Sequence, residues 1–326
     1  MIRHLVATIV LVSVAAPLLS AGQFELVKDD QGVTVKLNGE MFTRYLIRSG
    51  AKPILWPIIG PTGQEMTRGY PMRAVTQYEK ADHVHHRSFW FDHGDVNGIS
   101  FWAEDGKNGT IVQRRFVQLR DGDQAVISTD NDWVAPSGEK FCADVRTLTF
   151  NADAEQRWID FDVTVKAAYG QVTFGDTKEG SFGMRVAGSM RVERNAGGKI
   201  INSEGQTDKQ AWGKRAAWVD YSGPVYTKSG KTERVGIAIL NHPSSFRYPT
   251  YWHVRTYGLF AANPFGLHNF LGSDKVDGSF TLKPGQAFSF YYRVIFHRGG
   301  AKDIDLDKAF QTYAKLSKDG PQPNSQ

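Results

Sequence analysis

The chain has 326 residues, of which 41% are hydrophobic and 22% charged, a composition that is ordinary for a globular protein. Its formal net charge of +5 is spread along the chain without a basic run, which argues against a nucleic-acid partner. The single cysteine, Cys142, excludes an internal disulfide. Its place beside an expected strand indicates a buried small side chain and not a nucleophile.

Residues 1–21 have the pattern of a signal peptide. Arg3 and His4 precede a short apolar run that ends at Leu19, and small residues follow up to Ala21. The run is too short for a comfortable membrane span, and no later segment resembles one. The sequence therefore predicts an exported protein, periplasmic or extracellular, with no membrane span and a mature chain that starts near residue 22.

Strands dominate the expected elements. Residues 33–37 and 41–47 flank Asn38-Gly39, a strong hairpin signal. The prolines of residues 52–61 exclude both a helix and a central strand there, so we expect an ordered edge or loop. Further alternating segments predict strands at 110–119, 124–134, 144–150, 157–166, 182–192, 234–240 and 287–298.

Helical spacing of apolar residues occurs only near the C-terminus, at 304–316. Many antiparallel strands joined by short turns predict an all-β fold, a large antiparallel β-sandwich with this short C-terminal helix. No repeat or linker divides the chain. We therefore expect one domain over residues 22–318, followed by a polar, disordered tail at 319–326.

Residues 82–95 concentrate four of the nine histidines, together with three aspartates and Trp90. Imidazoles beside carboxylates can exchange protons near neutral pH or, when neutral, bind a metal. If this segment is extended, His83, His85 and Arg87 face one way and His86 the other. A His-x-His pair is a familiar arrangement of two metal ligands, and His93 is a possible third. Without a metal, the same side chains would bind a polar ligand.

Two later regions carry compatible chemistry. The loop 175–180 places Asp176 and Glu179 before a strand that contains Arg185, where the two acids can act as base and acid and the arginine can hold a polar ligand. The alternative is a solvated turn. Residues 241–269 combine histidines, amides and aromatic rings, a mixture typical of sugar sites, although core packing also accounts for single aromatic residues.

Other catalytic signatures are missing. There is no Gly-x-Ser-x-Gly elbow for a serine hydrolase. There is also no phosphate-binding glycine loop or dinucleotide fingerprint, which argues against a nucleotide cofactor.

Five motifs, at 83–90, 93–102, 175–180, 212–215 and 249–266, resemble the PmoA-related domain-of-unknown-function family of bacterial exported proteins. The resemblance covers nearly the whole mature chain, and Val84 stands where proline is usual in the family. The label of methane oxygenase is not supported, because a membrane subunit would need several apolar spans. The resemblance implies a β-supersandwich similar to galactose mutarotases and some polysaccharide lyases, and an association with sugar breakdown.

Together these features predict an exported carbohydrate-active enzyme that acts on a glycoside or sugar derivative without a cofactor. Hydrolysis, elimination and epimerisation all stay open. We expect proton exchange by His86, Glu179 and His253. The residues expected to bind the carbohydrate are His83, His85, Arg87, Trp90, His93, Asp176, Arg185, Tyr251, Trp252 and His268.

Two alternatives remain. The first is a metal-dependent hydrolase or lyase in which His83, His85 and His93 hold a divalent ion. The second is a non-catalytic glycan-binding module that uses the same aromatic residues. Each of these hypotheses about sugars requires the three polar regions to meet in one cavity. The sequence does not indicate an oligomeric state.

Overall fold

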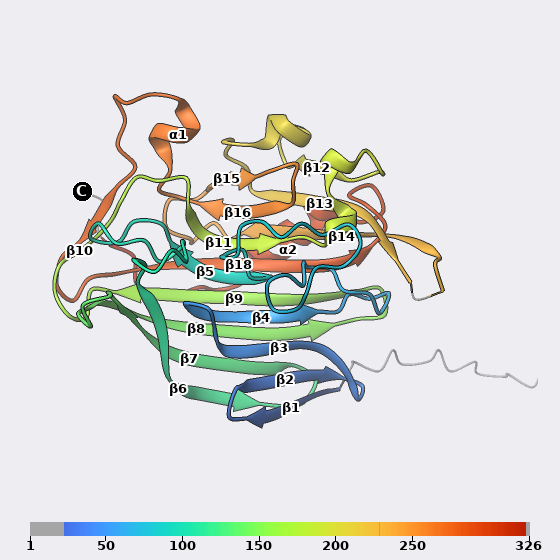
Figure 1. Cartoon of the computed structure of the whole chain (residues 1–326), viewed down its shortest axis with the longest axis horizontal. Coiled ribbons are helices and arrows are strands. Elements are labelled where there is room, and N and C mark those ends of the chain that lie inside the picture. Colours follow the sequence, from blue (N-terminus) through green and yellow to red (C-terminus); the bar gives the residue numbers. More distant parts are fainter. Residues whose placement is uncertain (1–22, 228, 324–326) are drawn as a thin grey trace, which may run out of the picture.

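The computed structural model describes residues 23–227 and 229–323 (Figure 1). The predicted signal peptide lies outside these residues. Two antiparallel sheets of eight strands each form a sandwich, and we call them sheet A and sheet B. This confirms the predicted all-β antiparallel sandwich. Among the described residues, no helix is long and apolar enough to cross a membrane.

Sheet A is assembled from both halves of the chain. Its strands, in spatial order, are β1 (Phe24–Asp29), β2 (Gly32–Leu37), β3 (Glu40–Ser49), β4 (Lys52–Ile58), β5 (Phe89–His93), β11 (Gly180–Arg185), β16 (Leu259–Asn263) and β15 (Tyr251–Val254). The first five strands follow one another along the chain, whereas the last three come from distant segments. The sheet therefore brings the histidine region beside the carboxylate loop and the late aromatic region.

Sheet B consists, in spatial order, of β12 (Lys199–Asn202), β13 (Trp218–Tyr226), β14 (Thr232–Asn241), β18 (Ala287–Arg298), β9 (Gln156–Lys166), β8 (Lys140–Ala152), β7 (Ala125–Val134) and β6 (Thr110–Arg120). A small sheet pairs β10 (Val172–Phe174) with β17 (Phe280–Leu282). The helices are α1 (Leu267–Leu271) and α2 (Leu306–Ala314), and 3-10 turns lie at Gly188–Met190, Val192–Arg194 and Asp208–Ala211.

The core lies between the two sheets and follows the alternation of the strands. In β9, Ile159, Phe161, Val163 and Val165 are buried, while the residues between them point to the other face. Cys142 is also buried in this core, as predicted. The Asn38-Gly39 hairpin forms as expected, with φ of 53° and 83° at the two turn residues, because a tight turn of this kind needs two positive φ angles.

The prediction that residues 52–61 form an edge or loop is wrong for the first part of that segment. β4 is a central strand between β3 and β5. Its prolines are tolerated because the ladder is interrupted where they occur. Ile54 and Leu55 pair with both neighbours, whereas Pro53 and Pro57 have no registered partner in either strand.

Two further boundaries differ from the expectations. The strand expected at 182–192 ends at Arg185, and 3-10 turns follow it. The tail was expected to be disordered from residue 319, but residues 319–323 lie against β18. The Pro321 carbonyl accepts a hydrogen bond from Ser289 Oγ at 3.0 Å, and Gln322 Nε2 donates to the Ser244 carbonyl at 2.8 Å. These hydrogen bonds hold Pro321 and Gln322 against the sandwich, which the polar composition of the tail does not predict.

Candidate functional site

The candidate site lies on the face of sheet A that points away from the core. Along β5, Phe89 and Phe91 enter the core while Trp90 faces outward, and along β15, Trp252 enters the core while His253 faces outward. In β11, Arg185 faces the same outer side as Trp90. Strand alternation thus selects which of the predicted residues can reach a ligand.

The histidine segment is a turn and not a strand. The His86 amide donates to the His83 carbonyl at 3.0 Å, and His83 has a φ of 45°. The buried Arg68 guanidinium donates to the His83 and His86 carbonyls and to Asp82 Oδ1 at 2.6 Å, so the segment folds around a cation. His83 and His86 therefore lie on the same side, contrary to the expectation for an extended segment.

Four nearly parallel rings stack into a column that runs from the surface into sheet A. Tyr257 stacks on His83 at 5.3 Å between ring centroids, His83 on His86 at 4.8 Å, and His86 on Trp90 at 5.4 Å. Trp102 packs edge-on against the two inner rings. The faces of His83 and His86 are thus occupied, and only the edges of these rings remain for a ligand.

His86 is fixed in one tautomer. Its Nδ1 lies 3.0 Å from Arg185 Nη1, and since a guanidinium can only donate, Nδ1 accepts and the ring proton is on Nε2. Burial, reinforced by the positive charge of Arg185, lowers the pKa of His86 well below 6.5. His86 is therefore a neutral hydrogen-bond donor, whereas the sequence suggested proton exchange.

His85 lies at the edge of the column, and its ring packs edge-on against His83 and His86. Burial lowers the pKa of His85 to about 4, aided by the charge of Lys52, while Glu179 opposes this shift. At neutral pH the ring is thus uncharged and close enough to Glu179 to sense its carboxylate. Its nitrogens make no hydrogen bond to another residue in the described part of the chain.

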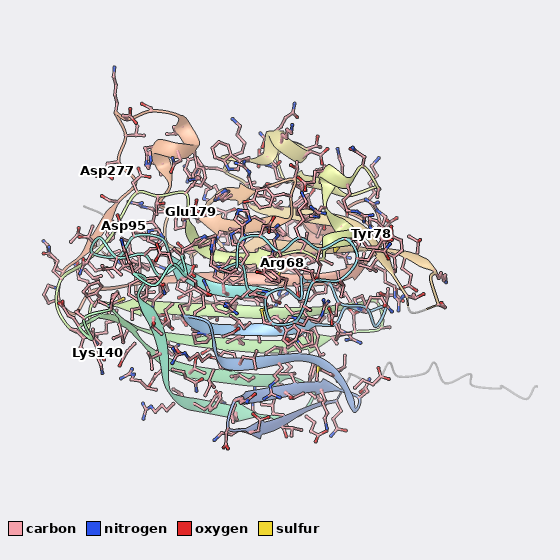
Figure 2. The ribbon with its side chains drawn as sticks, viewed as in Figure 1. Arg68, Tyr78, Asp95, Lys140, Glu179 and Asp277 are labelled. Atoms are coloured by element: carbon pink, nitrogen blue, oxygen red, sulfur yellow. The ribbon has the colours of Figure 1, made fainter. Side chains whose placement is uncertain are left out.

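Glu179 immediately precedes β11 and is labelled in Figure 2 at the segment leading into that strand. Its side chain is 35% exposed, and its one ion pair in the described chain joins it to Lys178 Nζ at 3.0 Å. The negative charge of Glu179 favours the protonated form of both His85 and His253. The acid from the middle of the chain thus lies near imidazoles from its first and last thirds.

His253 is oriented by a backbone carbonyl. Its Nδ1 lies 2.7 Å from the Lys178 carbonyl oxygen, which can only accept, so Nδ1 carries a proton and Nε2 has the free lone pair of the neutral ring. Burial lowers the pKa of His253 to about 4, while the bond to Lys178 and the charge of Glu179 oppose this shift. His253 is therefore a preoriented proton acceptor.

Aromatic side chains pack against His253, and a cationic side chain lies next to them. Trp212 packs edge-on to His253 at 6.3 Å, and Phe270 of α1 packs against both rings. The Arg255 guanidinium lies over Trp212 at 5.6 Å and over Tyr257 at 5.8 Å. A pocket of about 230 Å³ opens here, lined by Lys209, Trp212, Val254, Arg255 and Thr256.

Two predicted binding residues lie apart from this site. His93 is fully buried, with Nδ1 3.1 Å from Ser181 Oγ and Nε2 2.9 Å from the Gly175 carbonyl, so both ring nitrogens are engaged. Trp252 lies in the core between the sheets and donates from Nε1 to the Ala216 carbonyl at 3.0 Å. Neither side chain can reach a ligand on the outer face of sheet A.

Asp176 and His268 form a separate pair. His268 Nδ1 lies 2.7 Å from Asp176 Oδ1, and the Asp176 carboxylate also accepts from the backbone amides of His268 and Gly278. These bonds tie the loop before β11 to the segment that contains α1. The second acid of the predicted loop is thus occupied by backbone contacts, which gives it a positioning role.

The remaining predicted residues, Arg87, Trp90 and Tyr251, are each engaged by a neighbouring side chain. Arg87 makes a bidentate contact with Glu104, at 2.8 and 2.6 Å, and donates to Ser49 Oγ. Trp90 is buried at the base of the ring column, where the Lys52 ammonium lies 5.5 Å from its centroid. Tyr251 faces outward but stacks on Phe270 at 5.5 Å.

The three histidines of the metal alternative do not converge. His83 and His85 are neighbours in the turn, whereas His93 is in the core with both nitrogens engaged. Within residues 23–227 and 229–323, no group of three or more His, Cys, Asp or Glu side chains is arranged to hold a metal ion. A metal at this turn would need ligands that the described residues do not place there.

Residues 32–311 match the model of a protein family described as "Family of unknown function (DUF6807)". The chain belongs to this family. The match covers the whole candidate site, including the turn at 82–87 and the outward face of β15. None of the curated proteins compared with the chain matches it.

Several solved structures are similar to the chain at about 10% identity. One is a galactose mutarotase-like protein from Clostridium acetobutylicum, with a TM-score of 0.42, 10% identity, and 84% of this chain and 98% of that chain covered. Another is the GH36 alpha-galactosidase AgaA from Geobacillus stearothermophilus, with a TM-score of 0.37, 10% identity, and coverage of 85% and 41%. A galactose mutarotase related enzyme from Lactobacillus acidophilus has a TM-score of 0.26, 10% identity, and coverage of 85% and 98%. Similarity at this level of identity concerns the fold alone, so the chemistry of the site has to be argued from the residues of this chain.

Three side chains of the site were absent from the predicted set, namely Trp212, Arg255 and Tyr257. Trp212 and Arg255 belong to two segments that carry the family resemblance, 212–215 and 249–255, so motif membership was the available signal. Tyr257 lies just beyond β15, in the turn that connects it to β16, and nothing in the sequence links it to His83. Only the fold places these two rings in contact.

Proposed function

We propose that the chain is a carbohydrate-active enzyme in which Glu179 and His253 move a proton on a bound sugar. One observation carries this proposal. The partly exposed Glu179 directly follows Lys178, whose backbone carbonyl fixes the tautomer of His253. The charge of Glu179 acts on the neutral imidazoles of both His253 and His85. Paired acid–base groups with different environments are what proton transfer to and from a hydroxyl requires.

The site contains proton acceptors and donors in separate positions. Glu179 and the Nε2 atom of His253 can accept a proton from a sugar hydroxyl. The charge of Glu179 and the Lys178 carbonyl both favour the protonated form of His253, so the acquired proton can be shared between the two groups. The Nε2–H of His86 and the Arg185 guanidinium can donate to the oxygen that becomes negative.

The arrangement favours ring opening or elimination over two-carboxylate hydrolysis. Hydrolysis of a glycosidic bond by the common mechanisms needs two carboxyl groups that flank the bond. Asp176 is held by His268 and Gly278, and Asp82 is held by Arg68 and Arg185. Among these acids of the described residues, Glu179 thus differs in that its ion pair is with the exposed Lys178 alone. In ring opening, our proposal has Glu179 take the proton of the anomeric hydroxyl while the bond between the anomeric carbon and the ring oxygen breaks, and the ring oxygen takes up a proton from the acid–base pair. In elimination, Glu179 takes a proton from a sugar carbon, a carbon–carbon double bond forms, and the C–O bond to the leaving group breaks as the departing oxygen takes up a proton.

A panel of reducing sugars and glycosides tests this proposal. Interconversion of freshly dissolved anomers is followed by polarimetry, and elimination by the absorbance of the unsaturated product. We expect Glu179→Gln to reduce kcat/KM on the active substrate by about 100-fold or more, the usual contribution of a general acid or base. Glu155→Gln is the matched control, because Glu155 is a carboxylate with 80% exposure outside the site.

Full turnover by Glu179→Gln would overturn the proposal. If sugars bind to the wild type and to Glu179→Gln with equal affinity but no member of the panel is converted, the protein is a glycan-binding module instead. This second outcome is the alternative that Trp212 in the lining of the pocket supports, since aromatic rings bind sugars without any chemistry.

A further inference from the structure

The pocket beside His253 is lined by two cations. It has a volume of about 230 Å³, and its walls include Arg255, Lys209 and the indole of Trp212. A neighbouring pocket of about 400 Å³ shares Lys209 and Thr256 with it. The surface next to the proposed acid–base pair is therefore hollowed on the side where these positive charges lie.

Arg255 is held in place without being neutralised. Its guanidinium lies over the rings of Trp212 and Tyr257, and such contacts fix the orientation of the side chain while leaving its charge in place. Within the described residues, no carboxylate pairs with the Arg255 guanidinium or with the Lys209 ammonium. The buried Nε1 atom of Trp212 also has no hydrogen-bond partner there. The pocket is thus lined by two cations that no carboxylate of the described residues pairs with.

The carboxylates next to this pocket are paired with other cations. Asp208 accepts from Lys199 Nζ at 2.7 Å, and Glu193 accepts from Arg191 Nη1 at 2.5 Å and from Lys80 Nζ at 3.3 Å. An internal counter-ion for Arg255 would have to come from one of these pairs, at the cost of leaving its present cation unpaired. A ligand can supply the missing negative charge without that cost.

The charge balance around Glu179 points the same way. Near the imidazoles, Lys178 pairs with Glu179, and Arg68 and Arg185 share the single carboxylate of Asp82. The two cations of the pocket, Lys209 and Arg255, pair with no carboxylate of the described residues. The imidazoles of His85, His86 and His253 are neutral at pH 7, because burial lowers the pKa of each. An excess of positive charge attracts anionic ligands and raises their rate of association.

We propose that the sugar bound at this site carries a carboxylate, as a uronic or aldonic acid does, and that Arg255 and Lys209 bind that carboxylate. This inference rests on the proposed function and adds a substrate class to it. A guanidinium can bind a carboxylate through two parallel hydrogen bonds, which a neutral hydroxymethyl group cannot reproduce. With its carboxylate in the pocket, the ring of the sugar lies toward His253 and Glu179.

Equilibrium binding of two matched probes tests the inference. Methyl β-D-glucuronide and methyl β-D-glucoside differ only in the carboxylate, and calorimetry measures the affinity of each for the whole protein. We expect the glucuronide to bind at least about tenfold more tightly, and we expect this preference to weaken as salt is added. Arg255→Gln and Lys209→Gln should each remove most of the preference, Arg255→Lys should retain part of it, and Lys283→Gln, an exposed lysine elsewhere, should leave it unchanged.

The ratio of the two affinities separates recognition from a structural role. If Arg255 only supports Trp212, its loss would lower the melting temperature and leave the ratio as in the wild type, which would overturn the inference. Equal binding of the two probes by the wild type would also overturn it. Should Arg255→Gln fail to fold, Lys209→Gln carries the same test alone.

The Glu179→Gln variant separates this inference from the proposed function. We expect it to keep the preference for the glucuronide while losing turnover. A wild type that converts neutral sugars and does not bind glucuronides would contradict the carboxylate inference and leave the proposed function standing. A wild type that prefers the glucuronide but converts no sugar of the panel, acidic or neutral, would uphold the inference as a binding preference and contradict the catalytic proposal.

Discussion

Two carboxylates three residues apart, Asp176 and Glu179, have opposite environments. Asp176 accepts two backbone hydrogen bonds and contacts His268 Nδ1, and its side chain is only 9% exposed. Glu179 is 35% exposed and has a single exposed ion pair. One acid is thus fully used by the fold, whereas the other keeps its lone pairs for a ligand.

The two imidazoles that accompany these acids differ in the same way. In His268, Nδ1 contacts a carboxylate, and the ring belongs to a pair that joins two loops. In His253, Nδ1 donates to a carbonyl and Nε2 makes no hydrogen bond to another residue in the described part of the chain, while the charge of Glu179 favours the protonated ring. The comparison teaches that a catalytic candidate is recognised by the bonds it does not make. Residue type and spacing alone do not distinguish the two pairs.

The largest effect on activity is expected when the imidazole of His253 is replaced by an amide. In His253→Asn, the side-chain amide can still donate to the Lys178 carbonyl, but the proton acceptor at Nε2 is lost. We expect kcat/KM on the active sugar to fall by about 100-fold or more while the melting temperature changes little. His268→Asn is the matched control and should keep most of the activity. Equal losses in the two variants would mean that the comparison is wrong.

The next effect concerns stability. Asp176→Asn replaces an acceptor of backbone hydrogen bonds by a side chain that presents an amide group to some of the same donors. Leaving a buried donor unsatisfied costs about 1–3 kcal/mol, and urea denaturation should show a decrease of this size in the free energy of unfolding. Glu179→Gln should show almost none. A Glu179→Gln variant destabilised as much as Asp176→Asn would assign Glu179 to the fold.

The sequence predicted the sandwich better than it predicted the site. Strand periodicity is a local property, so the alternation of β9 and the Asn38-Gly39 hairpin were predicted directly. β4 was missed because proline is judged residue by residue, whereas its acceptability depends on which positions pair with β3 and β5. That information belongs to the register, and no local pattern contains it.

The site shows the same limit. The hypothesis was that the three polar regions share one cavity. Sheet A brings Glu179 near His85 and His253, but the pocket beside His253 is lined only by residues between 209 and 256, so the shared cavity stays a prediction. The pattern did not reveal that Trp252 would face the core and Trp212 the site, because the direction of a side chain depends on strand phase. The turn at 82–87 depends on the distant Arg68, whose role has no signature in the histidine segment itself.

A smaller effect on the free energy of unfolding is expected when the pH is lowered. The pKa of His253 in the folded protein is about 4, below its ordinary value of 6.5, and burial lowers the pKa of His85 to about 4 as well. Between these pH values the unfolded chain binds more protons than the folded one, so the free energy of unfolding falls as the pH decreases from about 6.5 toward 4. Denaturation at several pH values should give a shallower slope for His85→Gln than for the wild type. An unchanged slope would show that His85 is not protonated on unfolding in this range.

The smallest effect tests whether the ion pair of Glu179 matters to the fold. Lys178 and Glu179 are 43% and 35% exposed, and exposed ion pairs contribute roughly 0–1 kcal/mol because water and salt screen them. Lys178→Gln should therefore change the free energy of unfolding by less than about 1 kcal/mol, as measured by urea denaturation. Its backbone carbonyl, which orients His253, is unaffected by the substitution, so most of the activity should persist. A severe loss of activity at unchanged stability would instead place the Lys178 ammonium among the groups that contact the sugar.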